Sequence, residues 1–261
     1  MIDPWLLMLA FKMATAAAVV VGCSILAERS GPMIAALIAT LPISAGPVFV
    51  FLTLDHDAAF IAQGALGGMA SNLANAGLCL TYVLLAQRFG TLICLLAALA
   101  AWAATLALLR GLEPSFATML AATVVVYGGL HWLFRPYLAA RPKSPPSRPW
   151  YLIPMRAAFV AILAGTVTTL SAHVGPGWSG SLAALPIVLS SMIAMLQPRI
   201  GGPATAAVLA NGALALIGFG LALASIHLTA VPLGSAWSLT LALAIAMLWN
   251  LGLMRLSRRS R

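Results

Sequence analysis

Apolar runs long enough to cross a lipid bilayer follow one another along most of this chain. Of its 261 residues, 62% are hydrophobic and 7% are charged, whereas soluble domains carry about 25% charged residues. A spanning helix needs about 20 apolar residues, and in hydrocarbon the backbone polar groups must be paired within the protein. The sequence therefore predicts an all-α, polytopic membrane protein. About nine transmembrane helices are expected, at about residues 5–26, 32–53, 58–87, 91–110, 114–136, 151–172, 176–197, 201–228 and 234–255.

The basic residues collect between and after these apolar runs. A net charge of +9 would suggest a nucleic-acid partner in a soluble protein. In membrane proteins, however, Arg and Lys accumulate in cytoplasmic loops. We therefore expect the proline-rich basic loop 141–149 and the Arg-rich tail 255–261 in the cytoplasm, the N-terminus outside, and no nucleic-acid partner. The excess of Arg over Lys, with abundant Ala, is typical of a GC-rich bacterial genome and predicts the bacterial inner membrane.

One sequence pattern occurs twice, 144 positions apart. Residues 39–43 read Ala-Thr-Leu-Pro-Ile and residues 183–187 read Ala-Ala-Leu-Pro-Ile, and nine identities fall within 32 ungapped positions. An odd number of predicted spans precedes the second copy, so it would cross the membrane in the opposite direction, as in inverted-repeat transporters. We expect a first four-helix repeat at 1–110, a linker helix and basic loop at 111–150, and a second, inverted four-helix repeat with a basic tail at 151–261.

The shared Leu-Pro-Ile motif lies in the middle of an apolar run in both copies. A proline removes a backbone donor and disfavours helix at the residue before it, so each run is expected to be a discontinuous helix. A simple kink is the alternative, because proline is common in membrane helices. Where a second half-helix begins, free N–H groups and the positive end of the dipole attract anions. The residues expected at these two breaks are Pro42, Ser44, Gly46, Pro186, Ser190 and Ser191.

Two cations occupy equivalent positions in the two copies. Lys12 lies about two turns inside the first predicted span, and the 144-residue offset places it opposite Arg156 in the sixth. A cation inside a membrane is costly unless it finds water or a partner. We predict a pair of anion-coordinating groups, one reachable from each side of the membrane. Snorkelling of each side chain to the headgroups is the alternative.

Polar residues in the third and eighth spans are the remaining candidates. Asn72 and Asn211 are predicted to line a hydrated pathway, and hydrogen bonds between packed helices are the alternative. The turn Asp55-His56-Asp57 between the second and third spans is expected at the outer surface. The favoured interpretation is a solvated turn in which Asp57 caps the following helix. A proton relay is the alternative.

The order of motifs within each half resembles a known family. A first helix that carries Lys or Arg is followed by Gly-Pro, by a helix with Leu-Pro-Ile, and by a Gly-rich third helix that ends near Thr81-Tyr82. This order looks like that of the GlpM-like small bacterial inner-membrane proteins, which are about one repeat long. The resemblance would cover each half separately, and it implies an inner-membrane protein.

The predicted function is a secondary transporter for a small anionic solute, working by alternating access around a central site. An ion channel or passive permease on the same scaffold is one alternative. A non-transporting membrane protein that assists envelope biogenesis or lipid handling is another. The sequence has no nucleophile elbow, zinc-helix motif, phosphate-binding glycine loop or paired intramembrane carboxylates, so we expect no enzyme, catalytic residue, metal site or cofactor. The expected partners are a small-molecule or inorganic anion, the lipid bilayer, and a second copy of the chain in a homodimer.

Overall fold

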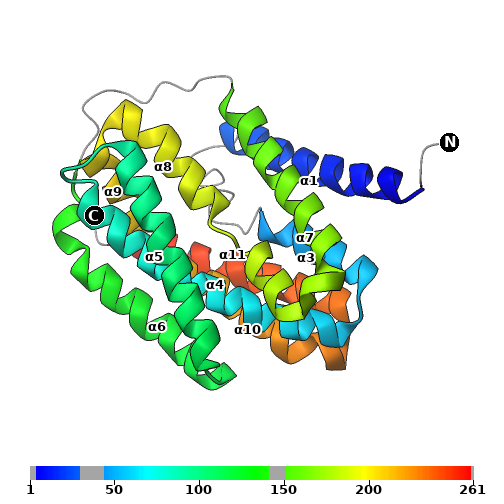
Figure 1. Ribbon diagram of the computed structural model, residues 1–261. Coiled ribbons are helices and arrows are strands. Elements are labelled where there is room, and N and C mark those ends of the chain that lie inside the picture. The colour runs from blue at the N-terminus through cyan, green and yellow to red at the C-terminus, as the bar shows by residue number, and fades with distance from the viewer. Residues whose placement is uncertain (1–3, 30–43, 141–150, 260–261) are drawn as a thin grey trace. The chain divides into compact units, whose positions relative to one another are not determined.

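A computed structural model describes residues 4–29, 44–140 and 151–259 of the chain (Figure 1). These residues form helices joined by short turns, without a strand among them, which confirms the all-α prediction. Seven helical stretches within the described ranges are long and apolar enough to cross a membrane. The structure thus supports a membrane protein of many spans. The prediction of about nine spans is met only in part.

The described chain forms two compact units, each assembled from separate stretches of sequence. Unit 1 comprises residues 1–68, 150–185 and 221–261, and unit 2 comprises residues 69–149 and 186–220. The predicted order of repeat, linker and repeat concerns internal symmetry, and it stays a prediction. Unit 1 contains α1 (Pro4–Arg29), α3 (Ala45–Asp55), the start of α4 (Ala58–Leu85), α7 (Leu152–Ala183), the end of α10 (Ala215–Leu233) and α11 (Ser235–Arg259).

Unit 2 contains the rest of α4 and of α10 together with the helices between them. These are α5 (Thr91–Leu112), α6 (Phe116–Leu133), the short 3₁₀ helix η1 (Arg135–Tyr137), α8 (Ile187–Ile200) and α9 (Gly202–Gly212). The predicted span 201–228 is interrupted, because α9 ends at Gly212 and α10 begins at Ala215. The predicted spans 58–87, 91–110, 114–136 and 234–255 agree with α4, α5, α6 and α11 to within a few residues.

The discontinuity predicted at Pro186 is present. α7 ends at Ala183 and α8 begins directly after Pro186. The apolar stretch 153–200 is 48 residues long. A straight helix of that length would measure about 70 Å, more than twice the hydrocarbon thickness of a bilayer. A second break at Gly175, with φ 75° and ψ 173°, divides α7 just before Pro176. The equivalent break at Pro42 lies outside the described residues.

In unit 1, α1 packs along α7. Met13 of α1 lies against Gly165 of α7, where an added Cβ would come within 2.9 Å of the Met13 sulfur. Trp5, farther toward the N-terminus, lines the same cavity as His173, farther toward the C-terminus. The two helices therefore run antiparallel. This pairing brings the polar residues of α1 to those of α7.

Small residues bring α4 and α7 into backbone contact. A Cβ added at Gly67 would lie 1.9 Å from the carbonyl oxygen of Gly177, and one added at Gly180 would lie 1.7 Å from that of Gly64. The buried Ser181 hydroxyl donates a hydrogen bond of 2.8 Å to the Gly67 carbonyl. Small residues permit such close approach of membrane helices. The contact holds the start of α4 on α7, and with it the preceding turn that contains His56.

Candidate functional site

An ion pair joins α1 to α3 in unit 1. The Lys12 ammonium lies 2.6 and 2.5 Å from the two carboxylate oxygens of Asp55. Lys12 is 5% exposed, whereas a third of the Asp55 side chain is exposed. An intramembrane cation is expected to pair with an acid in this way. Lys12 is therefore a buried cation with an acidic partner.

His56 extends this polar cluster to α7. Its Nε2 lies 2.7 Å from the Ser171 hydroxyl, and that hydroxyl donates its only proton to the Thr168 carbonyl at 2.8 Å. The imidazole also stacks on Phe60 of α4, with ring centroids 3.7 Å apart and an interplanar angle of 4°.

These groups line a cavity of about 500 Å³ between α1, α7 and the turn that follows α3. That volume is in the range of small-molecule sites. The wall combines apolar side chains of α1 with hydroxyl groups of α7, and its ionisable members are Lys12, Asp55, His56 and His173. The lining residues are Trp5, Met8, Leu9, Lys12, Asp55, His56, Thr168, Thr169, Ser171, Ala172 and His173.

Asp57 is not part of the cavity wall. Its carboxylate accepts a hydrogen bond of 2.8 Å from the backbone N–H of Phe60, in the first turn of α4. This is the capping role that the sequence predicts for Asp57. The neighbouring Asp55 keeps a third of its side chain exposed but pairs with Lys12, and His56 contacts Ser171, so this turn is only partly solvated.

Arg156, which the 144-residue offset pairs with Lys12, belongs to unit 1 but lies away from the Lys12 cavity. It stands near the start of α7, about 12 residues before the stretch that lines the cavity, and it is not among the lining residues. Twelve helical residues correspond to about 18 Å, so the two cations do not hold one small anion together. The Arg156 Nε is buried and has no hydrogen-bond partner among the described residues.

Two further predicted site residues belong to unit 1. Ser44 is buried at the N-cap position of α3, and its side chain makes no capping hydrogen bond. Gly46 follows in the first turn of α3 with open space around its α-carbon. Neither lines the Lys12 cavity. Both stand where a helix begins, as predicted, while their neighbour Pro42 lies outside the described residues.

The break after α7 places three predicted site residues in unit 2. Pro186 is buried at the N-cap of α8. The Ser191 hydroxyl donates to the Val188 carbonyl at 3.0 Å and is buried. The Ser190 hydroxyl is buried and lacks a hydrogen-bond partner within the described ranges. Of the three, Ser190 therefore keeps hydrogen-bonding capacity for a ligand.

The two asparagines predicted to line a pathway, Asn72 and Asn211, both belong to unit 2 but differ in burial and in hydrogen bonding. Asn72 is fully buried and donates from Nδ2 to the Leu216 carbonyl at 3.0 Å, while its backbone carbonyl accepts the Tyr127 hydroxyl. Asn211 is exposed and donates at 2.8 Å to Ala207 within its own helix. The structure thus shows Asn72 in hydrogen bonds between helices, which was the alternative interpretation. Its Oδ1 is buried without a partner among the described residues.

The pairing of Lys12 with Asp55 was missed from the sequence. Asp55 lies 43 residues beyond Lys12 and was assigned to an outer turn. A usable signal was present, since a Lys near the outer end of a span calls for an acid at the same level, and Asp55 and Asp57 were the nearby candidates. The Ser171 contact carried no such signal, because a single Ser in an apolar helix is common.

Comparison with known proteins identified no relative of this chain. No protein-family model, no curated protein and no solved structure matches it. The resemblance to the GlpM-like family therefore rests on the sequence motifs alone. What the site can do must be argued from its own residues.

Proposed function

We propose that this protein is a secondary membrane transporter for a small anionic solute, and that Lys12 is its anion-binding group in unit 1. One observation carries the proposal. Lys12 is 5% exposed and yet lines a cavity of about 500 Å³, so a fixed cation faces a volume that a solute can enter. Intramembrane ionisable residues of this kind mark substrate and ion pathways.

The packing of α1 on α7 supports alternating access on an inverted repeat. Met13 meets Gly165 in an antiparallel pair, so Ala17, four residues farther along α1, would face Ala161, its equivalent in the second copy. A pseudo-two-fold axis through that point would relate the two helices, as inverted repeats require. It would place Lys12 toward one end of the contact and Arg156 toward the other, one cation for each side of the membrane.

Transport by the purified protein in vesicles tests the proposal. Proteoliposomes should take up at least one of phosphate, sulfate, acetate or succinate with saturation and with exchange across the membrane. Lys12→Gln should reduce that uptake by about tenfold or more, which corresponds to about 1.4 kcal/mol of lost interaction. Arg255→Gln, an exposed cation of α11, is the matched control and should retain uptake. Saturable uptake that survives Lys12→Gln would contradict the assignment, and flux without saturation or exchange would indicate a channel.

We also propose a bacterial inner-membrane location with the N-terminus outside and the C-terminus in the cytoplasm. The distribution of Arg and Lys supports this orientation. The cavity of Lys12 would then open toward the outer side, because Asp55 and His56 precede the start of α4 on that side.

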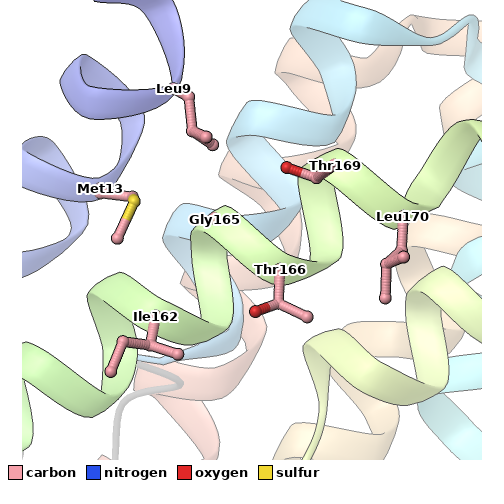
Figure 2. Close-up of a pocket in the computed structure, with 7 residues that line it drawn as sticks. All are labelled: Leu9, Met13, Ile162, Gly165, Thr166, Thr169 and Leu170. Carbon is pink, nitrogen blue, oxygen red and sulfur yellow. The ribbon is translucent and has the colours of Figure 1, made fainter. Parts of the chain in front are cut away.

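A second candidate function is lipid handling, and an apolar groove favours it. Figure 2 shows the groove between α1 and α7, where Leu9 and Met13 face α7. Its volume is about 370 Å³, and Leu9 and Thr169 belong to both this groove and the Lys12 cavity. An anionic headgroup at Lys12 could therefore extend an acyl chain into the groove.

The exposed Thr166 of the groove separates the two functions. Thr166→Phe would fill the groove and leave the cavity wall unchanged. A transporter of small anions should keep its uptake in this variant. A lipid-handling protein should lose binding of a long-chain carboxylate such as palmitate, measured with the purified protein in detergent.

A further inference from the structure

We propose that anion binding in unit 1 is coupled to protonation of Asp55, so that the solute enters together with one proton. This inference rests on the proposed function and names its coupling ion. It starts from the fact that Lys12 is already occupied: both oxygens of Asp55 lie within 2.6 Å of its ammonium group. A solute anion must therefore compete with this carboxylate for the charge of Lys12.

Protonation neutralises the Asp55 carboxylate, which otherwise competes with the solute anion for Lys12. If the anion binds at the same time, Lys12 is not left unpaired. A third of the Asp55 side chain is exposed, so a proton can reach it from outside, whereas Lys12 is reached through the cavity. The neutral carboxylic acid loses its ionic attraction for Lys12, and the ammonium becomes available to the solute. An unpaired charge is strongly disfavoured in a buried site. That cost favours an exchange in which the solute anion arrives as the carboxylate is neutralised.

The charges balance in this exchange. Before it, the cavity holds the Lys12 cation and the Asp55 carboxylate, with no net charge. Afterwards it holds the Lys12 cation, a neutral Asp55 and one monovalent anion, again with no net charge. One proton is bound to a carboxylate oxygen, no covalent bond of the solute changes, and the site stays neutral in a low-dielectric setting. Electroneutral uptake of one proton with one anion follows.

The other titratable groups around the cavity leave Asp55 as the group that controls Lys12. From the elements packed here, α1 contributes Lys12, the turn after α3 contributes His56, and α7 contributes His173. Asp57 caps α4 and lies outside the cavity wall, and α11, which packs on α3, contributes no lining residue. His56 adjoins Asp55 in sequence and contacts Ser171 of α7 through its Nε2.

Anion binding measured at two pH values tests the coupling. The probes are methanesulfonate and formate, monovalent anions that both stay ionised between pH 5.5 and 7.5. Thermal-shift titrations of the full chain in detergent should show wild-type affinity about tenfold or more higher at pH 5.5 than at pH 7.5. Asp55→Asn should bind with the high affinity at both pH values, and Lys12→Gln should show no specific binding at either. Asp57→Asn, the control, should keep the wild-type pH dependence.

A second measurement needs no variant. Mixing the wild-type protein with the tightest probe in weakly buffered solution near pH 7 should remove about one proton from solution for each anion bound, as reported by a pH indicator. Anion binding with no proton uptake, or pH dependence that persists in Asp55→Asn, would overturn the coupling and leave the transport proposal standing. If no probe binds wild type or Asp55→Asn at either pH, the anion-binding role of Lys12 fails as well.

Discussion

At the scale of single residues, the two partners of the ion pair, Lys12 and Asp55, differ in their exposure to solvent. Its cation is almost fully enclosed, while a third of the carboxylate side chain meets solvent. Loss of either partner leaves the other unpaired, and the penalty depends on how well water can replace the missing partner. A bare Asp55 can be hydrated from the exposed side. A bare Lys12 has less access to water.

This asymmetry predicts unequal effects of the two substitutions. Asp55→Asn should lower the free energy of unfolding in mild detergent by about 2 kcal/mol, below the 3–5 kcal/mol of a fully buried pair because Asp55 is partly exposed. Lys12→Gln should cost about half as much. The double variant should lose less than the sum of the two single variants, since the contacting partners are removed together. Additive effects, or a larger loss in Lys12→Gln, would contradict this description of the pair.

At the scale of the elements, two devices set how the helices of unit 1 are arranged. Gly175 adopts φ 75° and ψ 173°, a region that is essentially restricted to glycine, and so interrupts α7 ahead of Pro176. The small residues that follow bring α7 onto α4 at backbone distance. Glycine thus provides both a helix break and a close helix contact within six positions.

The contact between α4 and α7 makes Gly180→Ala a severe substitution. Its Cβ would lie 1.7 Å from the Gly64 carbonyl oxygen, so the helices would have to separate, at a cost of about 3 kcal/mol or more. The melting temperature in detergent should fall clearly. Gly22→Ala in α1 is the matched control, because an added Cβ there meets nothing within 4 Å, and alanine improves helix propensity by about 0.5–1 kcal/mol. Equal melting temperatures for the two variants would show that this contact does not form.

At the scale of the whole molecule, the arrangement of charges along the chain predicts its orientation. Basic residues gather in the loop 141–149 and in the C-terminal tail, while the turns that carry Asp55, Asp57 and Glu113 hold few. The positive-inside rule assigns the basic segments to the cytoplasm. This assignment determines the side of the membrane from which a solute would reach Lys12.

Reporter fusions measure this orientation directly. Alkaline phosphatase, which is active only outside the cytoplasm, should be active when fused after Glu113 and inactive when fused after Lys143 or after Arg261. Green fluorescent protein should give the opposite pattern. An active phosphatase at the C-terminus would reverse the proposed orientation and assign the Lys12 cavity to the cytoplasmic side.

The sequence by itself determined the class of the protein and several of its elements. Apolar run length predicted an all-α membrane protein, because only long apolar helices satisfy their backbone in lipid. Proline chemistry predicted the break before α8, which the structure confirms at Pro186, and short-range geometry predicted the Asp57 cap. These features depend on neighbouring residues, so local rules are sufficient for them.

Only the tertiary structure decided which side chains meet. The sequence places Lys12 inside a predicted span, but its partner lies 43 residues away, and Ser171 lies 115 residues from His56. Such contacts depend on the antiparallel packing of α1 on α7 and on the glycine contact that holds α4 there. Periodicity and composition describe one helix at a time. An apolar helix in lipid has no single buried face, so its sequence does not indicate which helices pack against it. For that reason the sequence located the cation, and the fold supplied the carboxylate that holds it.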